Sequence, residues 1–276
     1  MPVMKIHRHL HRHFAFHRGI GAASRPCRGL SGAVRYWAGG AMARRDFKSA
    51  LKSVSYVGAK ALFWPLFRLY FRVRVRGGER IPERGAFLLA ANHFSFADPL
   101  ILGCFLRRRL WFVMAEEQFE KPIVKTFSRL MDVVPVRAGA AFQLSAVRRI
   151  LSLLKEGRAV AIFPEGRRSD TGGLLDPQPG LGVFASRAGV PVVPVAIVGT
   201  REAYPPGRRY PKPGRVTLHV GEPMAFPGDT PPETIARRSM EAIAEILAEA
   251  GHGDYLGVFA SSRGGEAAQE GGALRG

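Results

Sequence analysis

The sequence predicts an α/β domain in which helices flank a mixed central sheet, preceded by an N-terminal amphipathic helical hook. Short apolar runs bounded by turn residues have the composition of buried strands. Stretches with helical periodicity lie between several of them. The chain has 276 residues, of which 46% are hydrophobic, and this is enough to fill one substantial core. We therefore expect one α/β domain over residues 77–260.

Residues 1–45 do not have the composition of a packed domain. They contain no Asp or Glu, and they interleave arginine with histidines before a stretch rich in glycine and alanine. Three interpretations stay open: an arginine-rich targeting peptide, a disordered basic tail, or a start-site artefact in which Met42 is the true first residue. No carboxylate or cysteine accompanies the histidines, so we expect no metal site there.

Residues 46–76 are expected to form the hook. On a helical wheel the apolar residues fall on one side and the lysines on the other. The apolar residues are Ala50, Leu51, Val54, Val57, Gly58, Ala61 and Trp64, and the lysines are Lys48, Lys52 and Lys60. Pro65 is expected to interrupt the helix, and aromatic residues mixed with arginines follow it. Such a segment fits an in-plane anchor on an anionic membrane. The alternative is a helix packed on the protein's own core.

Strands and helices alternate beyond Glu79. The expected strands are Phe87–Ala91, Trp111–Met114, Val133–Val136, Ala159–Phe163, Val192–Val198 and Val216–Val220. The expected helices are Pro99–Leu106, Ala140–Lys155, Gly180–Ala188 and Pro231–Ala250. Gly157 stands where a helix that ends near Lys155 would stop. Residues 261–276 are expected to be disordered, because glycine, alanine and polar residues dominate them.

The net charge of +19 predicts a polyanionic partner. A nucleic acid, an anionic bilayer and phosphorylated substrates are all candidates, and charge alone does not choose among them. Cys27 and Cys104 are too few for a disulfide framework, and they lack the close spacing of a structural zinc site. No apolar run reaches 18 residues, so a transmembrane span is not expected.

The first candidate site lies between an apolar strand and a helical run, from Asn92 to Pro99. Asp98 is expected to be the N-cap of that helix, with Pro99 in its first position. His93 then lies on the strand-to-helix turn, which can bring its imidazole against the Asp98 carboxylate. A histidine held by an aspartate can take a proton from an alcohol. The alternative is an ordinary loop histidine beside a helix cap.

The second candidate site follows the expected strand Ala159–Phe163. The segment Pro164–Ser169 places one acid and two guanidinium groups at the carboxyl end of that strand, where ligands of open α/β sheets bind. Arginine suits a phosphate because two parallel hydrogen bonds match the phosphate geometry. A solvated charged turn is the alternative.

Together the two sites resemble the lysophosphatidic acid acyltransferase branch of the glycerolipid acyltransferases. The motifs of that family, N-H-x-S-x-x-D and F-P-E-G-T-R-S, stand here as Asn92–Asp98 and Phe163–Ser169, with Arg167 in place of the threonine. The segment Val134–Arg137 loosely resembles a third block, which ends in an arginine assigned to phosphate binding. The resemblance spans residues 87–223.

The resemblance implies an acyl transfer by single displacement, without a covalent acyl-enzyme. His93 would be the base, and Asp98 would orient it. The residues implied to contact or shape the substrate site are Ser95, Arg137, Glu165, Gly166, Arg167 and Arg168. Arg137 and Arg168 would hold the acceptor's phosphate, with Arg167 as an extra ligand. No metal is implied.

The implied acceptor is a lysophospholipid, 1-acylglycerol-3-phosphate, which would be acylated at its sn-2 hydroxyl to phosphatidic acid. Another lysolipid, such as lyso-ornithine lipid, stays open. The implied donor is acyl-CoA or acyl carrier protein, with no further cofactor. The enzyme would be a peripheral or monotopic protein on the cytoplasmic face of the cell membrane, bound to its anionic surface.

Two other classes of protein fit the sequence less well. A nucleic-acid-binding protein would interleave cations with exposed aromatic residues on a groove or recognition helix. Here the aromatic residues gather on an amphipathic apolar face, so no nucleic-acid partner is expected. A serine hydrolase of the common kind would carry a G-x-S-x-G elbow, which this sequence lacks.

Overall fold

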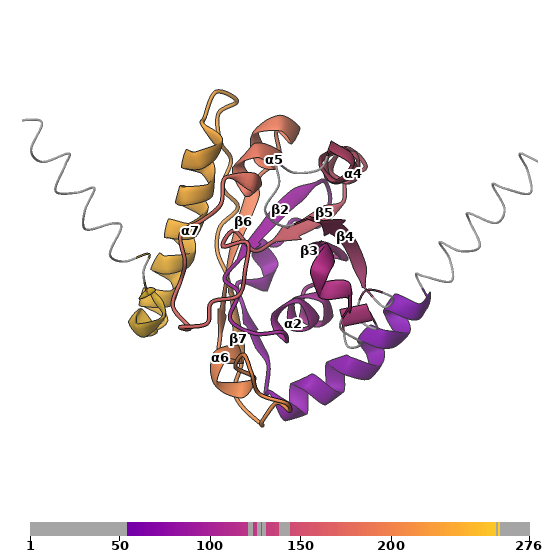
Figure 1. The fold of residues 1–276 in the computed structure, drawn as a ribbon, viewed down its shortest axis with the longest axis vertical. Coiled ribbons are helices and arrows are strands. Elements are labelled where there is room, and N and C mark those ends of the chain that lie inside the picture. The colour runs from indigo at the N-terminus through magenta and orange to yellow at the C-terminus, as the bar shows by residue number, and fades with distance from the viewer. Residues whose placement is uncertain are drawn as a thin grey trace, which may run out of the picture. The chain divides into compact units, whose positions relative to one another are not determined.

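Seven strands form one sheet in the order β1-β7-β6-β2-β5-β3-β4 (Figure 1). Their bounds are β1 Arg74–Arg76, β2 Phe87–Ala91, β3 Leu110–Ala115, β4 Asp132–Val136, β5 Ala159–Ile162, β6 Val192–Val198 and β7 Thr217–Val220. Neighbouring strands are parallel except β6 and β7, so the sheet is mixed, as predicted. The computed structural model describes residues 54–120, 124–125, 128, 131–137, 144–257 and 259, all within the unit Ala50–Gly276.

The central strand β2 determines where the first candidate site lies. All its residues are buried, and Leu88 is in register with Val160 of β5 and Val192 of β6. Because β2 and β5 are parallel neighbours, their carboxyl ends lie side by side. The residues that follow Ala91 and Ile162 therefore meet at one edge of the sheet.

Helices cover both faces of this sheet. Their bounds are α2 Asp98–Phe105, α4 Leu144–Lys155, α5 Gly180–Ala188, α6 Thr200–Ala203 and α7 Pro232–Glu249, with 3-10 turns η1 Gly78–Arg80, η2 Glu116–Glu120 and η3 Gly253–Tyr255. Alternate residues of a strand point to opposite faces. Leu89 accordingly packs in one core cluster with Ile101 of α2, whereas Leu88 packs in a second with Ile150 of α4 and Ile243 of α7.

All six expected strands form, with ends that differ by no more than one residue from those expected. The expected helices also form, and Gly157 stops α4 in a left-handed conformation with φ of 74°. The short strand β1 was not expected. Its sequence, Arg-Val-Arg, lacks the apolar run of a buried strand, because β1 lies at the edge of the sheet with both arginines exposed. The expectations for residues 1–45, 46–53, 140–143 and 261–276 lie outside the described residues.

Residues 54–70 form a helix that continues through Pro65, so the expected interruption there is wrong. The helix survives the missing N–H because packing holds it on both sides of the proline: Phe63 and Phe67 both contact the core. The wheel placed Lys60 on the side away from the exposed apolar residues, and this side faces the protein. The Lys60 ammonium group is half-buried and donates a hydrogen bond to the Leu106 carbonyl at 2.7 Å, at the end of α2.

The outward face of this helix is apolar. Its exposed residues are Val54, Val57, Leu62, Trp64, Leu66 and Leu69. On a helical wheel they lie opposite the inward-facing Tyr56, Phe63 and Phe67. One face therefore packs on the core, as the alternative predicted, while the opposite face presents the apolar residues that an anchor requires. Among the described residues, no helix combines the length and hydropathy needed to cross a membrane.

Candidate active site

The turn after β2 is fixed by the side chain of Asn92. This side chain is buried, its Nδ2 donates to the Ile197 carbonyl at 2.9 Å, and its Oδ1 accepts the Ile197 N–H at 2.7 Å. The amide thus continues the pairing of β2 with β6 by one residue after the strand has ended. As a result, the next residue, His93, leaves the sheet in a defined direction.

The Asp98 carboxylate holds the imidazole of His93. Its Oδ2 accepts three hydrogen bonds: from His93 Nδ1 at 2.9 Å, from the Phe94 N–H at 2.8 Å and from the Ser95 N–H at 2.7 Å. Asp98 is fully buried and is the first residue of α2, whose N-cap is Ala97. The expectation that Asp98 caps the helix is therefore wrong, because its carboxylate points back to the turn that precedes the helix.

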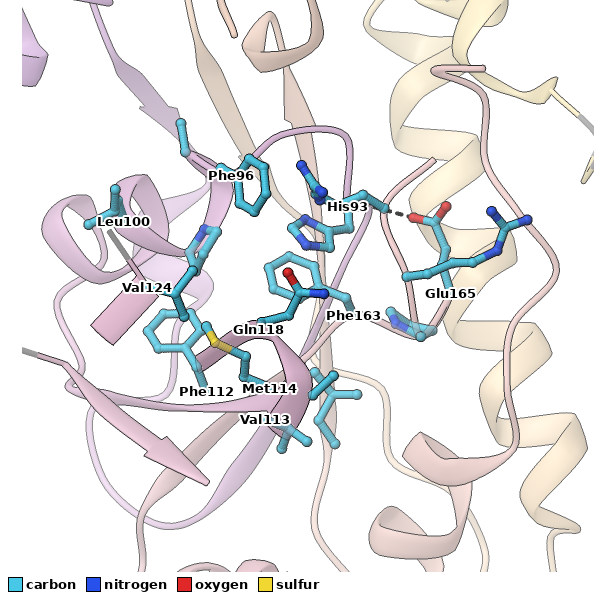
Figure 2. Close-up of a pocket in the computed structure, with 18 of the residues that line it drawn as sticks. His93, Phe96, Leu100, Phe112, Val113, Met114, Gln118, Val124, Phe163 and Glu165 are labelled. Atoms are coloured by element: carbon cyan, nitrogen blue, oxygen red, sulfur yellow. Dashed lines mark hydrogen bonds between the residues drawn. The ribbon is translucent and has the colours of Figure 1, made fainter. Parts of the chain in front are cut away.

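This arrangement defines the chemistry available to His93. With Nδ1–H donated to the side chain of Asp98, the other ring nitrogen, Nε2, is the basic atom. The ring lies on Phe163, with 4.0 Å between centroids and 18° between planes, and 17% of the side chain is exposed (Figure 2). The imidazole is thus oriented by two contacts, and its outer edge stays accessible.

Glu165 joins the two candidate sites. Its Oε1 accepts the His93 N–H at 2.8 Å, the bond drawn in Figure 2, and its Oε2 accepts the Leu175 N–H at 3.0 Å. Burial raises the pKa of Glu165 to about 8, against the opposing effect of these two N–H donors and of Arg167. Gly166 has φ of 71°, which lets the turn fold tightly enough to bring Glu165 under His93.

The three candidate phosphate ligands differ in their surroundings. The Arg168 guanidinium lies 3.3 Å from the ring centroid of Phe96, and burial lowers its pKa. Arg167 is 67% exposed, with Asp170 at 3.9 Å. Arg137 is exposed and donates to Glu116 at 2.8 Å. Arg168 is therefore the best ordered of the three by packing.

Ser95, which the resemblance implied at the substrate site, is buried beneath the His93 turn and does not line the cavity beside His93. Its hydroxyl donates to the Tyr204 carbonyl at 2.8 Å and accepts the Ala97 N–H at 3.1 Å, and the residue is fully buried. These bonds tie the His93 turn to the segment after α6. They leave no accessible hydroxyl for a nucleophile.

A cavity of about 1710 Å³ opens beside His93. The candidate residues that line it are His93, Arg137, Glu165, Gly166, Arg167 and Arg168. Apolar side chains such as Leu100, Phe112 and Met114 form another wall, which faces His93 in Figure 2. The cavity therefore offers a base, cationic groups and an apolar wall together.

Sequence reasoning missed several residues that line this cavity and also Leu175, which lies outside its lining. Arg209 and Tyr210 line it from the loop after α6, and their basic and aromatic surroundings in the sequence could have indicated them. Leu175 gave no such signal, because it contributes through its backbone N–H.

Comparisons with known proteins agree on one family. A family model described as Acyltransferase matches residues 72–198. A chloroplastic 1-acyl-sn-glycerol-3-phosphate acyltransferase of Arabidopsis thaliana is 32% identical over 151 residues, which cover 53% of this chain and 42% of the relative. The enzyme of that name from Bacillus subtilis is 28% identical over 153 residues, covering 55% and 73%. This chain thus spans about half the length of the plant and algal relatives it matches.

A solved structure shares the fold. The crystal structure of the 1-acyl-sn-glycerophosphate acyltransferase PlsC from Thermotoga maritima aligns with a TM-score of 0.59 and 28% sequence identity. The alignment covers 78% of this chain and 89% of that one.

Proposed function

The chain belongs to the acyltransferase family, and from that premise we propose that it transfers a fatty acyl group from a thioester donor to the sn-2 hydroxyl of 1-acylglycerol-3-phosphate, giving phosphatidic acid. The observation that carries the proposal is the His93–Asp98 pair, at 2.9 Å, beside a cavity with both cationic and apolar walls. A lysophospholipid carries a phosphate, a free hydroxyl and an acyl chain, and each has a matching group there.

In the proposed reaction, Nε2 of His93 accepts the proton of the acceptor's hydroxyl while the oxygen attacks the thioester carbonyl. A new C–O bond forms, the C–S bond breaks, and the imidazolium returns the proton to the departing thiolate. The buried carboxylate of Asp98 stabilises the imidazolium while it exists. General base catalysis of this kind contributes about 10²–10⁴-fold.

Arg168 is the proposed principal ligand of the acceptor's phosphate, with Arg137 and Arg167 assisting. Packing on Phe96 limits the guanidinium's freedom before substrate arrives, so little entropy is lost on binding. Arg137 must give up its ion pair with Glu116 to contribute. Because both side chains of this pair are exposed, the pair is weak and is readily broken. Glu165 is proposed to act by holding the backbone of His93, since both its oxygens are engaged by N–H groups.

The outward face of helix 54–70 is proposed to lie in the membrane interface, on the cytoplasmic side. Six exposed apolar residues on one helix face provide buried area for such binding. The inward face of the same helix supplies Phe63 and Phe67 to the cavity. An acceptor lipid could then enter the cavity from the bilayer along this helix.

The experiment that tests the function offers the purified protein a panel of lysolipids with acyl-CoA or acyl carrier protein and identifies products by mass. We expect phosphatidic acid from lysophosphatidic acid to dominate. Preferred acylation of an acceptor without a phosphomonoester, such as lyso-ornithine lipid, would contradict the proposed acceptor. No acylated product with any acceptor would contradict the proposed reaction.

A further inference from the structure

The last described residues of the chain contact the turn that carries His93, although they lie beyond residues 72–198 of the family match. Tyr255 in η3 is buried, and its ring meets Phe94 edge to face, with centroids 5.2 Å apart and planes at 87°. Its hydroxyl donates to Glu202 Oε2 at 2.7 Å and accepts the Gly199 N–H at 3.3 Å. Tyr255 thus ties the residue next to His93 to α6 and to its N-cap, Gly199.

The same segment pairs with the loop after Ser169 through its backbone. The Leu174 N–H donates to the Tyr255 carbonyl at 2.8 Å, and the Phe259 N–H donates to the Leu174 carbonyl at 3.3 Å. Between these bonds the backbones of Gly173 and Gly257 pack closely against each other, with no room for a side chain on either residue. A Cβ on Gly257 would lie 2.6 Å from the Gly173 Cα, a distance that requires the backbone to shift.

The loop held in this way reaches the catalytic histidine through Glu165. Leu174 is held by both of these backbone bonds, and Leu175 is the next residue in the chain. The N–H of Leu175 donates to Glu165 Oε2 at 3.0 Å. The other oxygen of Glu165 accepts the His93 N–H at 2.8 Å. A continuous path of contacts therefore leads from Tyr255 to the backbone of His93, alongside the direct contact of its ring with Phe94.

We propose that residues 253–257, together with Phe259, form a positioning clamp for the catalytic turn, in which Tyr255 and Gly257 are positioning residues. They fix Leu174 and Leu175, which orient Glu165, which in turn holds the backbone of His93. The inference rests on the proposed function, because the clamp matters to catalysis only when His93 is the base. A displacement of about 1 Å in a reacting group can cost about 10²-fold in rate, so a clamp of this kind has measurable consequences.

The first test compares Gly257→Ala with Gly251→Ala in the full chain. Both glycines have positive φ, 53° and 82°, but a Cβ at Gly251 would meet nothing within 4 Å. The control therefore carries the backbone strain without the collision. We expect Gly257→Ala to lower kcat about tenfold relative to Gly251→Ala, with both proteins folded at the assay temperature by circular dichroism.

The dependence of kcat on pH distinguishes a loss of positioning at Glu165 from a general loosening of the protein structure. The Leu175 N–H lowers the pKa of Glu165, which burial raises to about 8 and which Asp98 and Arg167 also influence. If the displaced loop withdraws this donor, the pKa of Glu165 rises, and we expect the part of the pH profile of kcat that depends on Glu165 to move to higher pH. A kcat and pH profile equal to those of Gly251→Ala would overturn the clamp, and so would a fall in kcat with an unshifted profile.

A second pair of variants decides the question if Gly257→Ala does not fold. Tyr255→Phe keeps the ring against Phe94 and the backbone bonds, whereas Tyr255→Leu removes the ring contact. We expect Tyr255→Phe to keep kcat within about threefold and Tyr255→Leu to lose at least about tenfold. Equal kcat in the folded Tyr255→Leu and wild-type proteins would overturn the clamp. Failure of the proposed function shows itself separately, as an active His93→Ala protein.

Discussion

Replacing Asp98 with asparagine tests how the carboxylate serves His93. The three donors on Oδ2 force the side-chain oxygen of an asparagine into the same place, because an NH₂ group there would face the Phe94 and Ser95 N–H groups. His93 Nδ1 would then keep its proton and its acceptor. The substitution would remove the negative charge while leaving the tautomer and the turn as they are.

The size of the effect follows from the geometry. A hydrogen bond to a charged group contributes about 1.5–3 kcal/mol, against about 0.5–1.5 kcal/mol for a neutral one, so losing the charge costs the imidazolium at least about 1 kcal/mol. The Coulomb attraction across about 4 Å at an effective dielectric constant near 20 gives an upper value of about 4 kcal/mol. At about 1.4 kcal/mol for each factor of ten, we expect Asp98→Asn to lower kcat about 100-fold with little change in KM.

The assay measures initial rates of acyl transfer at saturating donor and acceptor, beside thermal unfolding. Asp98→Ala is the comparison, because it leaves the buried Phe94 and Ser95 N–H groups without an acceptor. Each buried unpaired group costs about 1–3 kcal/mol, so the alanine variant, which leaves two N–H groups without an acceptor, should lose more stability than the asparagine variant. A folded Asp98→Asn protein with wild-type kcat would refute this reasoning.

Three further predictions test other parts of the site. Arg168→Ala should raise the KM of the acceptor far more than that of the donor, whereas Arg187→Ala, an exposed arginine on α5, should change neither; equal effects of Arg168→Ala on both substrates would contradict the phosphate assignment. Glu165 has a pKa raised from 4.5 to about 8, so the folded protein holds a proton that the unfolded chain releases between these values. The stabilisation from this bound proton is fully present below about pH 4.5 and is lost as the pH rises through 8. Urea unfolding of wild type and Glu165→Gln from pH 5 to 9 should therefore show a free energy of unfolding that falls more steeply with pH in the wild type. Leu69→Glu should weaken sedimentation with anionic vesicles, while Leu144→Glu, an equally exposed leucine on α4, should not; identical binding of both variants would argue against the helix 54–70 surface.

The local pattern of the chain was enough to predict most of the fold. Apolar runs such as Val192–Val198 define buried strands without reference to anything distant, and they were placed to within one residue. The strand β1 escaped because pairing with β7, and not burial of its side chains, makes it a strand. The helix interruption expected at Pro65 does not occur, because the packing of Phe63 and Phe67 on the core outweighs the missing hydrogen bond. Such packing is not visible in the sequence.

The candidate site was predictable where side chains act and obscure where the backbone acts. The spacing of His93 and Asp98 in a turn allowed their contact to be foreseen, although the helix-cap role expected of Asp98 was wrong. The role of Glu165 as a bridge between two backbone N–H groups depends on Leu175, whose side chain gives no hint of it. Tyr255 lies more than 150 residues from His93 in the sequence, so only the folded chain brings it against Phe94, the neighbour of His93.

The central claim is that His93 takes the proton from the acceptor's hydroxyl, and one comparison of wild type with His93→Ala tests it directly. Formation of phosphatidic acid is followed by mass at saturating lysophosphatidic acid and donor, with circular dichroism to confirm that both proteins are folded. We expect kcat to fall at least about 100-fold in His93→Ala. Turnover within a few-fold of wild type in the folded variant would contradict the account.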